Sequence, residues 1–144
     1  MVDYVIEPHV GVGPFKFKMT VEQARAVAGP PMHRNDHADE FGGGFMEYYD
    51  GYRLDYSPSG ILMAFEGVYG DVGMLLDGVN LFSITAKKLR ELLEASDPDV
   101  EVDAAGATSP RLGIGFYMDH MAAQARKKPE TVIAFAPGYY DPTS

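Results

Sequence analysis

The chain has 144 residues, of which 46% are hydrophobic and 23% charged, and this is the composition of one folded domain rather than of a disordered or fibrous protein. It contains no cysteine, which excludes disulfides, cysteine nucleophiles and cysteine-ligated zinc. The net charge is −9, and most of it lies in residues 1–80, where 12 acids stand against 5 bases. Such a charge repels phosphate backbones, so we expect no nucleic-acid partner.

The N-terminal segment argues against export. Residues 1–8 carry acids where a signal peptide needs Lys or Arg, and their apolar run is short. No stretch of the sequence approaches the roughly 20 apolar residues that a membrane span requires. We therefore expect a cytoplasmic protein without a membrane partner.

The first expected element is a helix that begins after Thr20 and ends at Gly29-Pro30. Thr20 can accept a backbone N–H of the first turn, and Gln23, three residues later, completes a capping box. The apolar residues are spaced to share one helical face: Val21, Ala24, Val27 and Ala28.

A polar segment with two histidines follows the first helix. His33 and His37 lie four residues apart among acidic residues, a spacing that would present two metal ligands on one face of a helix. The segment is flanked by Gly29-Pro30-Pro31 and Gly42-Gly43-Gly44, which favours a solvated loop instead. A small metal-dependent or ligand-binding protein that uses His33 and His37 remains the alternative hypothesis for function.

A β-hairpin is expected next. Residues 45–49 and 52–56 flank Asp50-Gly51, a pair that suits a two-residue type I′ turn. Along residues 52–56 aromatic and aliphatic side chains alternate with charged ones, which is typical of a strand with one buried face. A third strand is expected over residues 61–65.

The second half begins with another capped helix, which starts after Thr85 and ends at Ser96-Asp97-Pro98. Its apolar residues again share one face: Ala86, Leu89, Leu92 and Leu93. Strands are expected at residues 100–102, 112–117 and 131–136. Residues 118–128 have helical composition and are expected to form an inserted helix.

The two helix entries resemble each other at a constant offset of 65 residues. Phe17-Lys18-Met19-Thr20 corresponds to Phe82-Ser83-Ile84-Thr85, and Arg25 corresponds to Arg90. Internal similarity of this kind indicates a duplicated structural unit. The predicted fold is one α+β domain over residues 1–144, built from two tandem helix-plus-antiparallel-sheet units at about 11–71 and 77–141.

A family resemblance points the same way. The string Val12-Gly13-Pro14-Phe15-Lys16-Phe17-Lys18-Met19-Thr20, with Gly29-Pro30-Pro31 after the helix, resembles the helix entry of the β-lactamase-inhibitory protein family. A similar entry occurs in small lipoproteins of outer-membrane assembly. The resemblance implies two tandem units and a target enzyme bound across a concave sheet surface. The acidic character is also similar to that of bacterial immunity proteins, which neutralise a toxin by covering its active site.

Motifs that would indicate catalysis are missing from the sequence. The glycine-rich strings Gly11-Val12-Gly13 and Gly42-Gly43-Gly44 are not followed by the Lys-Ser/Thr pair of a phosphate-binding loop. The sequence has no nucleophile elbow, and it cannot place two carboxylates in one pocket. We therefore predict a protein that is not an enzyme and needs no cofactor.

The hairpin holds the candidate binding residues, because five of the 17 Tyr and Phe residues lie in it. Tyrosine offers a large contact area at a low cost in conformational entropy, and the interleaved acids would suit a basic partner protein such as a toxin or an enzyme. Sheet packing alone would also favour tyrosine at these positions. The predicted protein-binding residues are Tyr48, Tyr49, Asp50, Tyr52, Asp55 and Tyr56.

Overall fold

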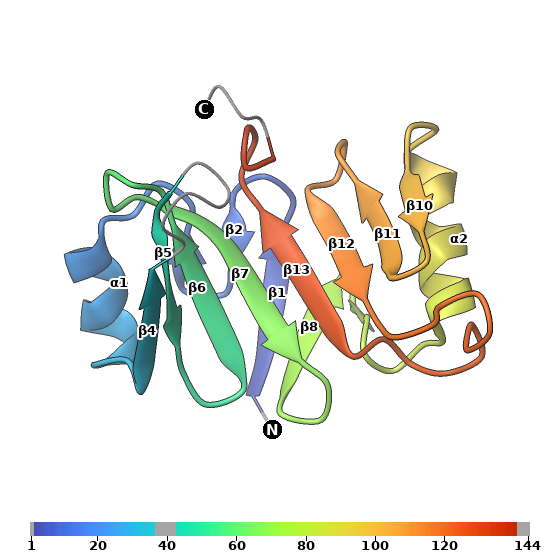
Figure 1. Ribbon diagram of the computed structural model, residues 1–144, viewed down its shortest axis with the longest axis horizontal. Helices are drawn as coiled ribbons and strands as arrows, with labels where there is room; N and C mark the ends of the chain where they lie inside the picture. The colour runs from blue at the N-terminus through green and yellow to red at the C-terminus, as the bar shows by residue number, and fades with distance from the viewer. Residues whose placement is uncertain (1, 37–42, 141–144) are drawn as a thin grey trace.

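The computed structural model describes residues 2–36 and 43–140. Over these residues the chain forms two helices, α1 (Val21–Ala28) and α2 (Ala86–Ser96), and two mostly antiparallel sheets (Figure 1). The α+β class is therefore confirmed. Neither helix is long and apolar enough to cross a membrane.

The larger sheet has eight strands, all antiparallel, in the order β10-β11-β12-β13-β7-β6-β5-β4. Each helix is followed in the chain by four of these strands, and the two groups of four meet where β7 pairs with β13. The strands of the first group are β4 (His33–Asp36), β5 (Phe45–Tyr48), β6 (Tyr52–Tyr56) and β7 (Leu62–Val68). Those of the second are β10 (Glu101–Asp103), β11 (Gly106–Ser109), β12 (Ile114–Tyr117) and β13 (Thr131–Phe135).

The smaller sheet has five strands in the order β3-β2-β1-β8-β9, and its β1 and β8 run parallel. Its strands are β1 (Val2–Glu7), β2 (Gly11–Val12), β3 (Phe15–Lys16), β8 (Val72–Leu76) and β9 (Val79–Asn80). The sequence pattern predicted none of them, because β2, β3 and β9 are two residues long and β1 pairs with a strand 70 residues away.

One face of the large sheet is covered along its whole width. Helix α1 lies at one end of this face, the small sheet in the middle and α2 at the other end (Figure 1). Aromatic rings join the two sheets: the centroid of Tyr4 is 5.1 Å from that of Phe65, and that of Phe15 is 5.6 Å from that of Tyr52. These rings belong to the main core.

The opposite face of the large sheet, here called the helix-free face, carries a smaller apolar cluster. Ala64, Ile133 and Phe135 form its buried part, with Tyr117 and Tyr139 packed against them. The Tyr139 ring centroid is 5.8 Å from that of Phe135, so residues after β13 cover part of this face.

Both helix starts form as predicted. The Thr20 side chain accepts from the Gln23 backbone N–H while the Gln23 side chain accepts from the Thr20 N–H, which is the expected capping box. Thr85 accepts from the N–H of Lys88 at 3.1 Å. The apolar face of α1 is narrower than predicted, since Val27 is exposed while Ala24 is fully buried.

The predicted helix over residues 118–128 is wrong. The segment runs as successive turns, and His120 has a φ of 51°, which interrupts a right-handed helix. Its carbonyl groups instead satisfy the start of α2: the N–H of Ala86 donates to Lys127 O at 2.8 Å, and that of Lys87 donates to Ala125 O at 2.9 Å. The segment therefore closes the end of the domain against α2.

Two local expectations for the first half also need correction. His33–Asp36 is a strand at the edge of the large sheet rather than a loop, because it finds a partner in β5. The hairpin forms between β5 and β6, but its turn is not type I′. That type needs a positive φ at both central residues. Gly51 has a φ of 85°, but the φ of Asp50 is not positive.

Candidate functional site

The structure separates the six predicted binding residues into two groups. Tyr52 and Tyr56 are 9% and 2% exposed and face the core, so they cannot present their rings to a partner. Tyr52, Leu54 and Tyr56 share one face of β6, as predicted. That face is the one covered by the small sheet and α1. Tyr52 accordingly stacks on Phe65, with ring centroids 5.1 Å apart.

Asp55 lies on the helix-free face, and it is also buried. The Tyr139 hydroxyl donates a hydrogen bond to its Oδ2 atom. Burial, followed by the Asp55 charge, raises the pKa of Tyr139. Asp55 therefore fastens the segment after β13 to the sheet and is not a surface group.

The remaining predicted residues lie near the β5–β6 turn. Asp50 is exposed, and Tyr48 and Tyr49 are half-buried. Tyr48, Tyr49 and Tyr52 line one hollow of about 370 Å³, here called the hairpin hollow. Its other lining residues are Gly51, Arg53, Val68, Asp71, Glu130 and Thr131.

Negative charge exceeds positive charge around the hairpin hollow. Arg53 is neutralised by Glu66, whose Oε1 lies 3.0 Å from its Nη2, and its guanidinium carbon lies 5.8 Å from the Tyr48 ring centroid. The carboxylates of Asp71 and Glu130 are exposed, and no cation of the described residues lies within ion-pair distance of either. The hollow therefore presents aromatic rings and net negative charge to the solvent.

An ion pair with a buried carboxylate holds Tyr49 in place. Glu47 is fully buried and accepts from Arg25 of α1, through Nε at 3.1 Å and through Nη2. The Tyr49 hydroxyl lies 3.3 Å from Gly29 O and 3.4 Å from Glu47 Oε1. Burial, followed by the charge of Glu47, raises the pKa of Tyr49 to about 12.

Sequence reasoning missed Glu47, although one signal was present. Glu47 alternates with Phe45 and Tyr49 on the strand, so it belongs to the same face as two aromatic residues. A carboxylate on a buried face needs a cation, because an isolated buried charge is strongly disfavoured. Arg25, on the covering helix, was the available partner.

The structure gives little support to a metal or ligand site at His33 and His37. His33 is exposed on the edge strand, with its ring centroid 5.4 Å from that of Tyr48, and His37 lies outside the described residues. Within residues 2–36 and 43–140, no group of three or more His, Asp or Glu side chains lies close enough together to hold a metal ion.

The chain matches no protein-family model, no curated protein and no solved structure. A functional conclusion therefore depends on the residues of the hollow and on their charge.

Proposed function

We propose that this chain is a non-catalytic protein-binding module that accepts a basic side chain of a partner protein in the hairpin hollow. The observation that carries the proposal is the combination of Tyr48 and Tyr49 with the carboxylates of Asp71 and Glu130 around one hollow. Because Glu66 already neutralises Arg53, the rim attracts cations.

The chemistry of the lining favours Lys or Arg as the inserted group. A cation is attracted to the face of an aromatic ring within about 6 Å, and the attraction increases as water is excluded. Tyr49 is held by Gly29 O and Glu47, so little conformational freedom is lost when a partner covers it. The net charge of −9 would also accelerate the approach of a basic protein.

Inhibition or immunity is the most concrete form of this proposal. The module would cover a basic active-site cleft of an enzyme or toxin with the hairpin end of its large sheet. The family resemblance implies binding through a sheet surface, and the hollow adds a place for one cationic side chain.

We also infer that the domain consists of two tandem units. The supporting observation is that each helix follows a short hairpin, β2–β3 or β8–β9, and precedes four antiparallel strands. The strand order of the large sheet is the same when counted outward from β7 or from β13. On this interpretation the second unit begins at Val72, with β8, rather than at residue 77.

The binding proposal is tested by isolating the partner from native cells and measuring its affinity for variants. Tyr48→Ala and Asp71→Asn should each weaken binding by about 2 kcal/mol, which is the usual threshold for a hot-spot residue. Tyr140→Ala is the matched control, since Tyr140 is an exposed aromatic that does not line the hollow. If the control weakens binding as much as Tyr48→Ala, or if neither hollow variant has an effect, the proposal is wrong.

A further inference from the structure

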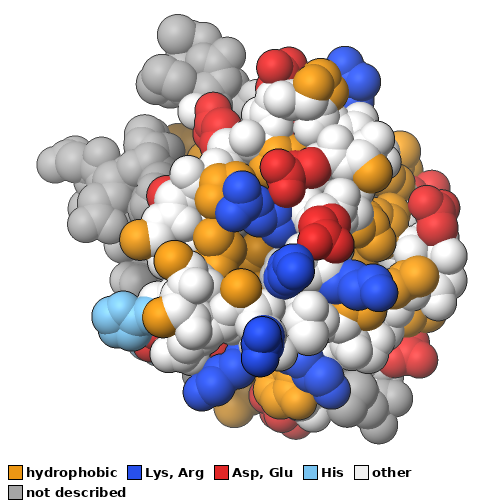
Figure 2. All heavy atoms as spheres, turned by 90° about the vertical axis from the view of Figure 1, so that its right-hand side faces the viewer, with side chains coloured by type: hydrophobic (Ala, Val, Ile, Leu, Met, Phe, Trp, Pro, Cys, Tyr) orange, Lys and Arg blue, Asp and Glu red, His pale blue; other side chains and the backbone are white. Residues whose placement is uncertain are grey.

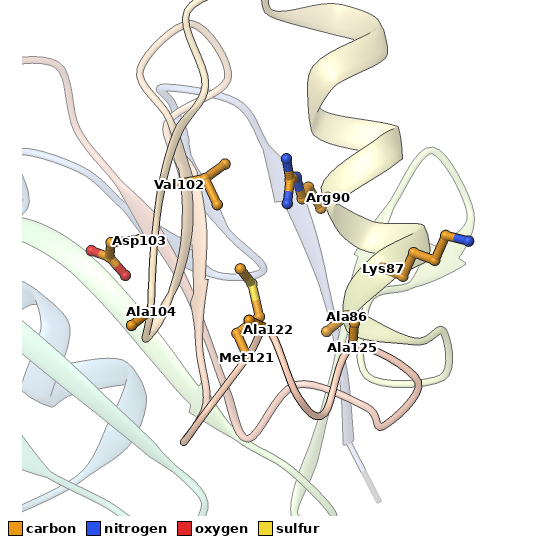
Figure 3. Close-up of a pocket in the computed structure, with 9 residues that line it drawn as sticks. All are labelled: Ala86, Lys87, Arg90, Val102, Asp103, Ala104, Met121, Ala122 and Ala125. Atoms are coloured by element: carbon orange, nitrogen blue, oxygen red, sulfur yellow. The ribbon is translucent and has the colours of Figure 1, made fainter.

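A second pocket, which shares no lining residue with the hairpin hollow, opens at the other end of the molecule. It lies between the first turns of α2, strand β10 and the turns at 121–125, and its volume is about 430 Å³ (Figure 3). Most of its lining is apolar: Ala86, Val102, Ala104, Met121, Ala122 and Ala125. A pocket of this size and polarity is typical of a small-molecule site.

One charged side chain points into this apolar pocket. Figure 3 shows the Arg90 guanidinium extending from α2 toward Val102, whereas Lys87 points away from the pocket. Among the described residues Arg90 has one ion-pair partner, Glu94 on the same helix, at 3.1 Å from its Nε. Both side chains of this pair are nearly half exposed, so the pair is weak and leaves the remaining guanidinium donors available.

Arg25, the counterpart of Arg90 on α1, binds a carboxylate. Arg25 and Arg90 each lie five residues after the capping threonine of their helix. Arg25 binds the carboxylate of Glu47, which comes from the second strand after α1. The second strand after α2 is β11, Gly106–Ser109, which contains no carboxylate. Arg90 therefore faces its pocket without the sheet carboxylate that Arg25 has.

The elements around the pocket carry charges of both signs: six bases stand against five acids, Glu91, Glu94, Glu101, Asp103 and Asp119, and Asp103 lines the pocket. Half of the 12 Lys and Arg residues lie on α2 and on the segment that caps it: Lys87, Lys88, Arg90, Arg126, Lys127 and Lys128. The hydrogen bonds from Ala86 and Lys87 to residues 125 and 127 bring the two groups together. Figure 2, which views this side of the molecule, shows Lys and Arg side chains interspersed with Asp and Glu and with exposed hydrophobic side chains.

We propose that this pocket binds a small carboxylate with an apolar body, whose carboxylate pairs with Arg90 and whose body packs on Met121, Ala122 and Ala125. Arg90 offers a planar fork of donors that matches a carboxylate, and the alanines leave space for hydrocarbon.

The test uses octanoate as the probe, with octanol and octylammonium as matched compounds that lack the negative charge. Titrations of the full chain followed by backbone amide NMR should show saturable shifts at residues 86–90, 102–104 and 121–125 with octanoate. Octanol and octylammonium should bind at least about tenfold more weakly. Equal binding of octanol or octylammonium, or no saturable shift with octanoate, would overturn the proposal.

Two pocket variants and one control complete the test. Arg90→Gln should weaken octanoate binding about tenfold, and Ala122→Phe, on an exposed turn, should abolish it by filling the pocket while the fold is retained. Arg126→Gln removes a nearby charge that does not line the pocket and should change the affinity less than twofold. If Arg126→Gln weakens binding as much as Arg90→Gln, the attraction is diffuse and no carboxylate site exists.

Discussion

At the scale of single residues, Tyr52 is held in the core by two aromatic rings from distant strands. It shares one face of β6 with Leu54 and Tyr56, as their alternation in the sequence predicts. Which face is buried depends on Tyr4 and Phe15, whose rings reach this strand from β1 and β3. Contacts between segments so distant in the chain leave no local signal, so two of the predicted surface tyrosines proved to be core residues.

The ion pair between the half-exposed Arg25 and the buried Glu47 leads to the first prediction. Arg25→Met leaves the Glu47 carboxylate buried without a cation, and should lower the free energy of unfolding by about 3 kcal/mol. This is the low end of the usual cost, because the Arg25 side chain is 42% exposed and water can reach the pair. The measurement is urea denaturation at pH 7.

The double variant Arg25→Met/Glu47→Leu is the control for this prediction. It removes the buried charge together with its partner, so most of the lost stability should return. If the double variant is as unstable as the single one, the cost comes from lost packing and not from the unpaired carboxylate.

At the scale of secondary structure, both helices could be predicted because their signals are local. A capping threonine, apolar spacing and a stop signal all lie within one short segment. The turns at 118–128 show the converse. Their alanine-rich composition favours a helix, but the backbone carbonyls of Ala125 and Lys127 bond to the start of α2 instead. A tertiary contact thus overrides a weak local preference.

The caps provide the second prediction. Thr20→Ala removes the acceptor for the Gln23 N–H, and should cost about 1 kcal/mol of stability. Thr20→Ser keeps the hydroxyl and should cost much less. Thermal unfolding of the three proteins checks this order, and equal melting temperatures for Thr20→Ala and Thr20→Ser would contradict the role of the cap.

At the scale of the whole molecule, tyrosines are packed against both faces of the large sheet. Burial is the main cause of raised pKa values for Tyr49, Tyr52, Tyr56, Tyr139 and Tyr140, and that of Tyr49 rises to about 12. These residues lie on both faces of the large sheet. Above about pH 10, their hydroxyl groups stay neutral only while the sheet remains covered.

The third prediction concerns alkaline pH. Unfolded tyrosines ionise near pH 10, whereas Tyr49 in the folded protein ionises near 12. The folded state therefore binds more protons above pH 10, so the contribution of these tyrosines to stability is constant below about pH 10 and is lost as the pH rises from 10 toward 12. Absorbance at 295 nm and near-UV circular dichroism should change together in one steep step. Gradual ionisation of the shielded tyrosines with intact circular dichroism would contradict this prediction.

The proposed function depends on the hairpin hollow, and photo-crosslinking in native cells tests it most directly. A photoreactive phenylalanine analogue is placed at position 48 in one protein and at position 140 in another. We predict that the variant at 48 attaches to one partner protein, on a peptide that contains Lys or Arg, and that the variant at 140 does not. A crosslink from position 140 alone, or a position-48 peptide without a basic residue, would contradict the proposed function.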